Sequence, residues 1–424
     1  MPDLWKIIPG DVRESLALLP ERSVHVAITS PPYWGLRDYG HPAQLGLEQT
    51  MQEYIAGQVE VFREVRRVLR DDGTLWLNMG DRYTSTTTTG RNDSDRMYGE
   101  DSKDLISSGP SGIVLPSGMR PGNLMGMPWR LAFALQADGW FLRSDIIWAK
   151  SNPMPESVKN RPTKSHEYMF LLSKQQQYYY DGEAVKNDSK VSWNAKRGFG
   201  VMRPKAECLS DENLDLQRTQ FAHKTHHDDC EKTGANLRTV WSINTEALKS
   251  QHFAAFPQKL VVPCIKAGTS ERGCCPKCGA HWTRIVARGR NATRPGDESK
   301  VAEVIARTKL GNTPGKAKTS SKSTLGFALE IGNRDPQRHV TFTSTVGWEP
   351  GCACGEDAIP CTVLDPYCGS GTTLLVASKL GRRSIGCELN PEYVEMAKQR
   401  ITQGLRPDAI DKPALVKQKG GFFK

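Results

Sequence analysis

The chain has 424 residues, of which 38% are hydrophobic and 25% are charged, a balance typical of globular proteins. This composition excludes a mostly disordered chain, a coiled coil and a collagen-like repeat, and the length is enough for two or three compact units. Lys and Arg outnumber Asp and Glu by 57 to 47, and the net charge of +10 favours a polyanionic partner such as nucleic acid. Without a long apolar run or a secretory signal in residues 1–10, we expect a soluble intracellular protein.

Strands and helices alternate from the first residues onward. Short apolar runs predict strands, and apolar residues three or four positions apart predict the helices between them. Such alternation is typical of a parallel sheet with helices on its faces. The predicted elements are strand 5–8, helix 12–19, strand 24–29, helix 51–69 ended by Asp71-Asp72-Gly73, strand 74–78, helix 128–135, strands 141–148 and 167–172, and a strand–loop–helix–strand–helix unit over 362–401.

A glycine-rich turn follows the strand expected at 362–365. Gly371 is followed by two threonines, so this is not a phosphate-binding loop, and the dinucleotide pattern is also absent. Asp365 at the mouth of the turn suits a cationic or amino-bearing ligand. Glu388, about 20 residues further at the end of the next strand, is placed to hold a ribose. S-adenosylmethionine has a sulfonium, an amino group and a ribose, and it fits this pattern.

The sequence Ser30-Pro31-Pro32-Tyr33-Trp34 follows the strand expected at 24–29. Two consecutive prolines fix the backbone and remove two N–H donors. The Ser30 hydroxyl and the Pro31 carbonyl would then form a rigid pair of acceptors, with the flat faces of Tyr33 and Trp34 beside them. Two acceptors aimed at the hydrogens of an exocyclic amine would localise its lone pair for attack on a methyl group. The aromatic rings would stack on a base swung out of a duplex.

Together the two motifs resemble those of the DNA amino-methyltransferases, which methylate N4 of cytosine or N6 of adenine. The order, with the catalytic motif before the cofactor motif, is similar to their circularly permuted β class. Further segments that match the family are 10–11, 128–130, 148–155, 166–168 and 252–257.

The resemblance implies a permuted Rossmann-like, S-adenosylmethionine-dependent methyltransferase fold. It implies that Ser30, Pro31, Pro32 and Tyr33 are catalytic. The residues that it implies for the cofactor are Asp11, Phe253, Asp365, Pro366, Tyr367, Gly369, Ser370, Gly371, Thr372 and Glu388. The implied partners are double-stranded DNA, a second copy of the chain in a homodimer and a cognate restriction nuclease, in the cytoplasm of a bacterium or as a phage-encoded protein at the nucleoid.

The sequence does not decide which base is methylated or which class of substrate is used. Family members with Ser in the first motif position are more often cytosine-N4 enzymes, so cytosine is slightly favoured over adenine. A cytosine-C5 enzyme needs a cysteine nucleophile, and neither Pro263-Cys264 nor Pro360-Cys361 is placed to attack. An RNA or protein amine methyltransferase and a non-catalytic DNA-binding module are the alternatives.

The chain has 11 cysteines, and in an intracellular protein this number favours a metal site plus buried thiols over a disulfide framework. Cys275 and Cys278 form a Cys-x-x-Cys-Gly turn, and Cys352 and Cys354 form a Cys-x-Cys-Gly turn. Four thiolates predict a closed, structural zinc site, with Cys274 as a substitute ligand and free or redox-active thiols as the alternative. We expect His281 to be an ordinary polar loop residue.

Basic residues outside the predicted core are candidates for contact with DNA: Lys159, Arg161 and Lys164, with Trp34 beside the base, and further on Lys196, Arg197 and Arg203. The chain is expected to divide into six parts. They are a catalytic half of the core at 1–183 with a mobile loop at 84–122, a target-recognition region at 184–240, a core segment near the cofactor at 241–270, a zinc-knuckle insertion at 271–361, the cofactor-binding half at 362–405 and a basic tail at 406–424.

Overall fold

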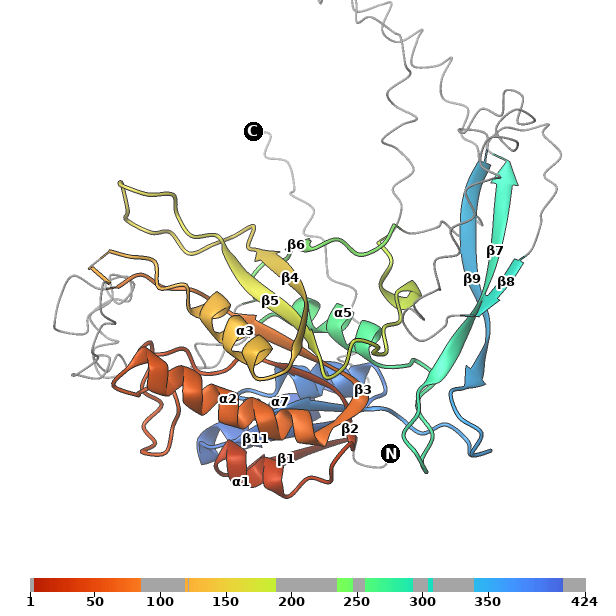
Figure 1. Ribbon diagram of the computed structural model, residues 1–424, viewed down its shortest axis with the longest axis horizontal. Coiled ribbons are helices and arrows are strands. Elements are labelled where there is room, and N and C mark those ends of the chain that lie inside the picture. Colours follow the sequence, from red (N-terminus) through yellow and green to blue (C-terminus); the bar gives the residue numbers. More distant parts are fainter. Residues whose placement is uncertain are drawn as a thin grey trace, which may run out of the picture.

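The computed structural model describes residues 4–84, 119–120, 122–187, 235–246, 256–292, 304–307 and 339–406 (Figure 1). The predicted mobile loop, the target-recognition region and the basic tail lie largely outside these residues. The strands are β1 (Trp5–Pro9), β2 (Val24–Thr29), β3 (Leu69–Met79), β4 (Phe141–Ala149), β5 (His166–Ser173), β6 (Val240–Ser242), β7 (Trp282–Ala292), β8 (Val304–Arg307), β9 (His339–Pro350), β10 (Thr362–Asp365) and β11 (Arg383–Glu388). The helices are α1 (Val12–Ala17), α2 (Met51–Val68), α3 (Met127–Ala137), η3 (Glu183–Val185), α5 (Gln258–Gly268), α6 (Thr372–Lys379) and α7 (Pro391–Gly404).

The core is an eight-stranded sheet in the order β1-β11-β10-β2-β3-β5-β4-β6. The strands from β1 to β3 in this order are parallel, as the alternating pattern predicts. β5 runs antiparallel to both β3 and β4, so the sheet is mixed. The reason is the connection: no helix crosses a face of the sheet between β4 and β5, and two strands joined in this way pair antiparallel.

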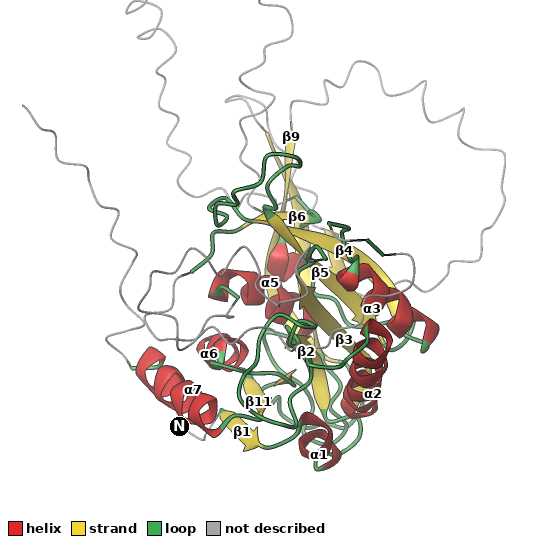
Figure 2. Cartoon of the chain, turned by 90° about the vertical axis from the view of Figure 1, so that its left-hand side faces the viewer, coloured by secondary structure: helices red, strands yellow, loops and turns green. Residues whose placement is uncertain are grey.

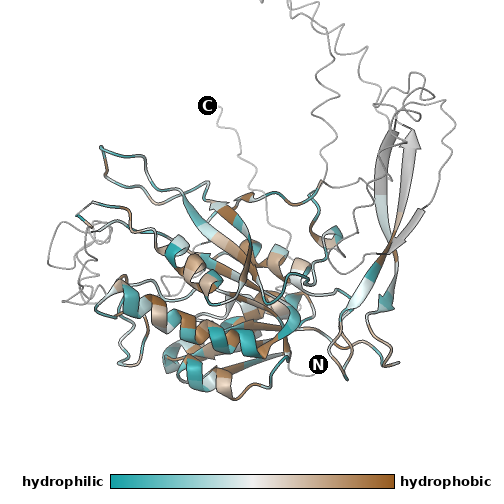
Figure 3. Ribbon diagram, in the orientation of Figure 1, coloured by the Kyte–Doolittle hydropathy of each residue, from teal (hydrophilic) through white to brown (hydrophobic). Residues whose placement is uncertain are grey.

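Helices cover both faces of the core sheet. α1, α2 and α3 pack together on one face, and α5, α6 and α7 pack on the other, as Figure 2 shows. Apolar residues of the strands pack against apolar residues on the covering helices to form the core (Figure 3). Among the described helices, none is both long enough and apolar enough to cross a bilayer.

The boundary between α2 and β3 differs from the prediction. α2 begins with a reciprocal cap in which Thr50 Oγ1 accepts from the Glu53 amide at 3.2 Å and Glu53 accepts from the Thr50 amide at 3.0 Å. The helix ends at Val68, and β3 starts at the next residue, so the expected helix stop at 71–73 lies inside the strand. The pairing of β2 with β3 is irregular there, which accommodates the extra residues of β3.

A second, antiparallel sheet of the order β8-β7-β9 projects from the core (Figure 1). A buried ion pair joins its base to the core: Arg284 on β7 donates to Asp181 at 3.0 Å and to Glu271 at 2.8 Å. His281, which precedes β7, is a correction to the sequence analysis. It is buried because it stacks on Tyr179, with 3.8 Å between ring centroids, and its Nδ1 lies 3.3 Å from Asp72 Oδ2.

Asp181→Ala is expected to lower the free energy of unfolding by about 3 kcal/mol, because it leaves the buried Arg284 guanidinium with one anion fewer. Urea unfolding followed by circular dichroism measures this change. Asp145, an exposed carboxylate on β4, is the control, and Asp145→Ala should change the free energy by less than about 0.5 kcal/mol. Equal stability of the Asp181→Ala variant and the wild type would show that this ion pair does not hold the second sheet to the core.

Candidate functional site

The site lies where β10 and β2 are neighbours in the core sheet. From β10 the chain continues through α6 to β11, and from β2 it continues through α2 to β3, in opposite directions along the sheet. α6 and α2 lie on opposite faces. Such a switch point opens a crevice at the carboxyl ends of the strands, which is where parallel sheets bind ligands.

A cavity of about 540 Å³ occupies this crevice, a size suited to a cofactor or a nucleoside. Both predicted motifs line it, although more than 300 residues separate them in the sequence. The predicted site residues in its wall are Asp11, Ser30, Pro31, Pro32, Tyr33, Lys164, Pro366, Tyr367, Gly369, Ser370, Thr372 and Glu388.

Five other predicted contacts with the cofactor or DNA do not line the cavity, and a sixth, Phe253, lies outside the described residues. Asp365 and Gly371 lie behind its wall. Trp34 is a correction: it is only 1% exposed and donates from its indole to the Glu48 carbonyl at 2.8 Å, so its ring belongs to the core and offers no face to a base. Lys159 is exposed outside the cavity.

Arg161 also lies outside the cavity, and its charge is already paired. It donates to Glu156 at 2.7 Å and its guanidinium lies 3.8 Å from the centroid of the Tyr83 ring. Lys164 differs, because its side chain lines the cavity and its ammonium bonds to the Asp81 carbonyl. Burial lowers the pKa of Lys164.

The glycine-rich turn between β10 and α6 is held by hydrogen bonds to its neighbours. The amide of Gly369 donates to Glu388 Oε2 at 2.8 Å, and the other oxygen of Glu388 accepts from the Asn390 amide at 2.9 Å. Gly371 has a φ of +75°, and a Cβ there would lie 3.1 Å from side-chain atoms of Ala397 and Ile401 on α7. Gly371 therefore serves the close approach of α7 rather than the cavity directly.

Asp365 lies behind the cavity wall and links the two motifs by hydrogen bonds. Its Oδ1 accepts from the Thr29 hydroxyl at 2.7 Å and from the Tyr367 amide at 3.1 Å. Its Oδ2 has no hydrogen-bond partner among the described residues. Burial raises the pKa of Asp365 to about 6, although the hydrogen bonds from its neighbours oppose this shift. A cation reaching this carboxylate would offset the cost of keeping it charged.

Other predicted cofactor residues also interact with neighbouring groups of the protein. Burial raises the pKa of Glu388. Asp11 caps α1 and pairs with Arg13 at 2.7 Å, and this bond lowers the pKa of Asp11. The Tyr367 hydroxyl donates to Gln58 at 3.0 Å, which fixes the tyrosine ring against α2.

The Ser30–Tyr33 segment is rigid for reasons beyond its prolines. The Pro32 carbonyl accepts from the Tyr54 hydroxyl at 2.8 Å. The Tyr33 hydroxyl donates to Glu167 Oε2 at 3.0 Å, and Ser30 Oγ lies 3.4 Å from the Tyr33 oxygen. Gly80 allows this arrangement, because a Cβ there would lie 3.0 Å from the Tyr33 ring.

Glu167 is held by a cation. Lys150 Nζ lies 2.5 Å from Glu167 Oε1, and both residues line the cavity. Burial acts to raise the pKa of Glu167, but Lys150 and then Lys164 and Tyr33 outweigh burial, and the pKa is lowered. At neutral pH Glu167 is therefore a carboxylate.

Sequence reasoning missed the roles of Glu167, Lys150 and Gln58. Glu167 and Lys150 stand at the ends of apolar strands, a position that was available as a signal. Gln58 lies four residues from both Tyr54 and Phe62, so it is a polar residue on the apolar face of a helix, and it is fully buried.

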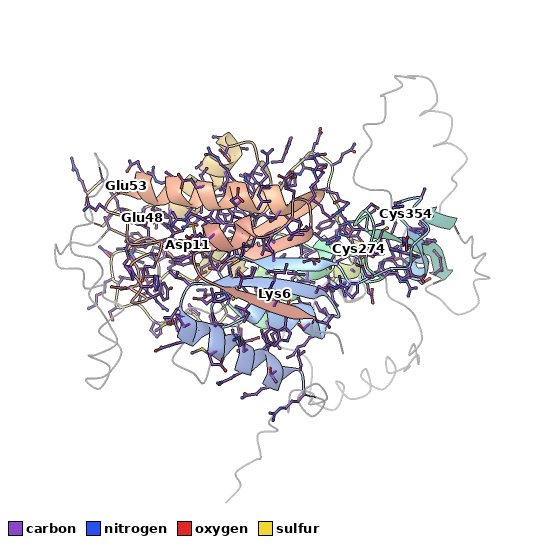
Figure 4. All side chains as sticks on the ribbon, turned by 90° about the horizontal axis from the view of Figure 1, so that it is seen from below. Lys6, Asp11, Glu48, Glu53, Cys274 and Cys354 are labelled. Atoms are coloured by element: carbon purple, nitrogen blue, oxygen red, sulfur yellow. The ribbon has the colours of Figure 1, made fainter. Side chains whose placement is uncertain are left out.

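The structure brings Cys275, Cys278, Cys352 and Cys354 together, with their sulfurs all within 4.8 Å of one another. The spacing is compatible with thiolates around one tetrahedral ion. Gly279, after the first turn, has a φ of +71°. Figure 4 shows Cys354 and Cys274 on the opposite side of the molecule from Asp11, which lines the cavity.

A second group, His25, Cys274 and Cys361, is buried beside the four cysteines. His25 Nδ1 accepts from the Thr362 amide at 3.0 Å, and its Nε2 then donates to the Gly279 carbonyl at 3.0 Å. Both ring nitrogens are occupied, so His25 has no lone pair for a metal. Cys274, the expected substitute ligand, belongs to this packed group and not to the four-cysteine cluster.

Comparison with known proteins agrees with the two motifs. A family model for N6/N4 DNA methylases matches residues 24–276 and 361–399. Type II methyltransferase M.SmaI of Serratia marcescens is 37% identical over 93% of this chain and 90% of that protein, and M.Cfr9I of Citrobacter freundii is 34% identical over 93% and 87%. Among solved structures, the cytosine-N4-specific PvuII DNA methyltransferase has a TM-score of 0.46 at 15% identity, over 94% of this chain and 90% of that one.

Proposed function

The chain belongs to the family of N6/N4 DNA methylases, and from this premise we propose that it is a site-specific type II DNA methyltransferase acting on an exocyclic amine. The observation that carries the proposal is that both motifs line the same cavity. When bound, S-adenosylmethionine supplies an electrophilic methyl group on its sulfonium. The chain's own residues hold the amine in line with it, and no covalent enzyme intermediate is needed.

The residues present fit S-adenosylmethionine. The unpartnered, buried Oδ2 of Asp365 suits the ammonium of the methionine end. Each oxygen of Glu388 accepts one amide and keeps a second lone pair for a ribose hydroxyl. Asp11, which the resemblance assigns to the cofactor, lies in the wall of the cavity. Phe253 stays a predicted contact, and Phe256, three residues further, does line the cavity.

The catalytic roles fall on Ser30, Pro31, Pro32 and Tyr33. The Ser30 hydroxyl and the Pro31 carbonyl accept the two amine hydrogens, and the Tyr33 ring stacks on the flipped base. The rigidity of the segment supports these roles, because acceptors that are already placed need no reorganisation as charge develops on the amine nitrogen. The catalytic motif comes first along the chain, and we propose the permuted β-class arrangement.

We propose N4 of cytosine as the target in preference to N6 of adenine, on the basis of Ser30 in the first motif position. We propose that Lys159 and Lys164 contact the DNA backbone. Arg161 is paired with Glu156, and we propose that it contributes less to this contact. The homodimer, the cognate restriction nuclease and a cytoplasmic location stay predictions, as does the division of the chain into its six parts.

We propose that Cys275, Cys278, Cys352 and Cys354 bind one structural zinc ion. The support is the approach of their four sulfurs, and none of the four cysteines lines the cavity. When bound, the ion would cross-link the two cysteine turns at the base of β7 and β9.

Incubation with methyl-labelled S-adenosylmethionine and duplex DNA, RNA or protein tests the proposed function. We expect label in duplex DNA, and mass analysis of its nucleosides should show N4-methylcytosine. Ser30→Ala and Tyr33→Ala should reduce transfer by at least about 100-fold and leave the Kd for S-adenosylmethionine within a few fold. Label in RNA or protein alone would overturn the substrate class, and loss of cofactor binding in both variants would mean that the roles are misassigned.

The affinity for S-adenosylmethionine should fall as the pH drops through about 6, since the pKa of Asp365 is about 6 and the ammonium binds the ionised form. One pH unit below this pKa the Kd should rise about tenfold. Calorimetric titration between pH 5 and 8 (roughly the range that spans this pKa) measures the effect.

Asp365→Asn is the control for this pH dependence. It should bind more weakly than the wild type at neutral pH and show a flat Kd across the same range. A slope of equal size in the Asn variant would assign the titration to another group, such as Glu388.

Purified protein should contain one zinc ion per chain, measured by plasma mass spectrometry. Cys278→Ser should lose the ion and lower the Tm, because the metal is expected to contribute folding free energy to the insertion. Cys264→Ala, at a buried thiol within α5, should keep the ion. The metal site would be contradicted if the wild-type protein contained no zinc as purified and took up none when refolded with zinc present.

A further inference from the structure

A chain of hydrogen bonds runs from the catalytic serine to a lysine on the neighbouring strand. Ser30 Oγ lies 3.4 Å from the Tyr33 oxygen, the Tyr33 hydroxyl lies 3.0 Å from Glu167 Oε2, and Glu167 Oε1 lies 2.5 Å from Lys150 Nζ. All four residues line the cavity. Lys150 and Glu167 lie in the segments 148–155 and 166–168, which match the family. Neither the Ser30–Tyr33 motif nor the glycine-rich turn gives these two residues a role.

The chemistry of the groups gives this chain one direction. A lysine ammonium can only donate, and an ionised Glu167 can only accept. The Tyr33 hydroxyl therefore has to donate its single hydrogen to Glu167, and its oxygen is left as an acceptor. Ser30 can satisfy that acceptor only by donating its own hydrogen. The Ser30 oxygen then presents nothing but lone pairs to the cavity.

This direction matters for transfer to an amine. A Ser30 hydroxyl that was free to rotate could donate its hydrogen to the amine nitrogen, and this would occupy the lone pair that must attack the methyl group. With its hydrogen committed to Tyr33, Ser30 can only accept an amine hydrogen, which increases electron density on the nitrogen. The orientation is set before substrate binds, so it costs no reorganisation during the reaction.

We propose that Glu167 and Lys150 are positioning residues that commit the Ser30 hydrogen to Tyr33 and so make Ser30 an obligate acceptor for the target amine. The inference rests on the proposed function, since it assumes that an exocyclic amine enters the cavity beside Ser30. It adds a role for the Tyr33 hydroxyl, separate from stacking by the Tyr33 ring.

Glu167→Gln tests the proposal because the variant keeps size and an acceptor oxygen but adds an N–H₂ donor. The amide can donate to Tyr33 and reverse the chain, which frees the Ser30 hydrogen. We expect kcat for DNA methylation to fall on the order of 10- to 100-fold, with the Kd for S-adenosylmethionine unchanged. Tyr33→Phe removes the hydroxyl and keeps the ring, and it should cause a similar fall.

The double variant separates positioning from a general structural defect. Once Tyr33→Phe has broken the chain, Glu167→Gln should cause no further loss of kcat, whereas two independent defects would multiply. Glu64→Gln is the matched control, because Glu64 also pairs with a cation, Arg67, but on the outer part of α2, and its kcat should equal that of the wild type.

Two results would overturn the inference: a wild-type kcat for Glu167→Gln, or a fully multiplicative loss in the double variant. Both are distinct from failure of the proposed function, which would appear as wild-type enzyme that methylates no exocyclic amine in DNA. Cofactor affinity and circular dichroism of each variant show whether it is folded, and Tyr33→Phe supports or contradicts the proposal even if a Glu167 variant does not fold.

Discussion

The pairing of β2 with β10 is the constraint on which the site depends. Val26 and Ala27 pair in parallel with Val363 and Leu364, so two segments from opposite ends of the chain finish at the same edge of the sheet. The hydrogen bond from Thr29 to Asp365 joins the last residues of the two strands. Neither motif alone encloses a cavity. Their adjacency, which comes from backbone pairing, creates a place where a cofactor and a nucleobase can meet.

The charges around this cavity divide into two sets with different tasks. Asp365 is buried and Glu388 is half-buried, and burial raises the pKa of both, so they gain from a ligand that brings a cation or hydroxyl donors. Glu167 is a half-buried acid paired with Lys150, which contributes to lowering its pKa. The first set is therefore suited to binding, and the paired Glu167 is suited to orienting the groups that face the base.

Much of the architecture could be predicted from local patterns, because the strands are short apolar runs and the helices have caps and apolar faces that the sequence displays. The motifs could be placed at strand ends for the same reason. The antiparallel β5, the burial of Trp34 and the bond between Tyr33 and Glu167 could not, because each depends on which strands are neighbours. Trp34 shows the difference well: beside two prolines it suggests an exposed face, but its indole bonds to Glu48 in the core.

The position of the four cysteines explains why a metal there would act on the fold rather than on the reaction. The Gly279 carbonyl accepts from His25 on β2, and His25 accepts from the Thr362 amide at the start of β10. The cysteine turn thus contacts the sheet near the amino ends of these two strands, whereas the cavity lies at their carboxyl ends. A thiolate site with four protein ligands has no open position for substrate. Its contribution to methyl transfer would have to pass along β2 and β10, by holding in register the same two strands whose pairing assembles the cavity.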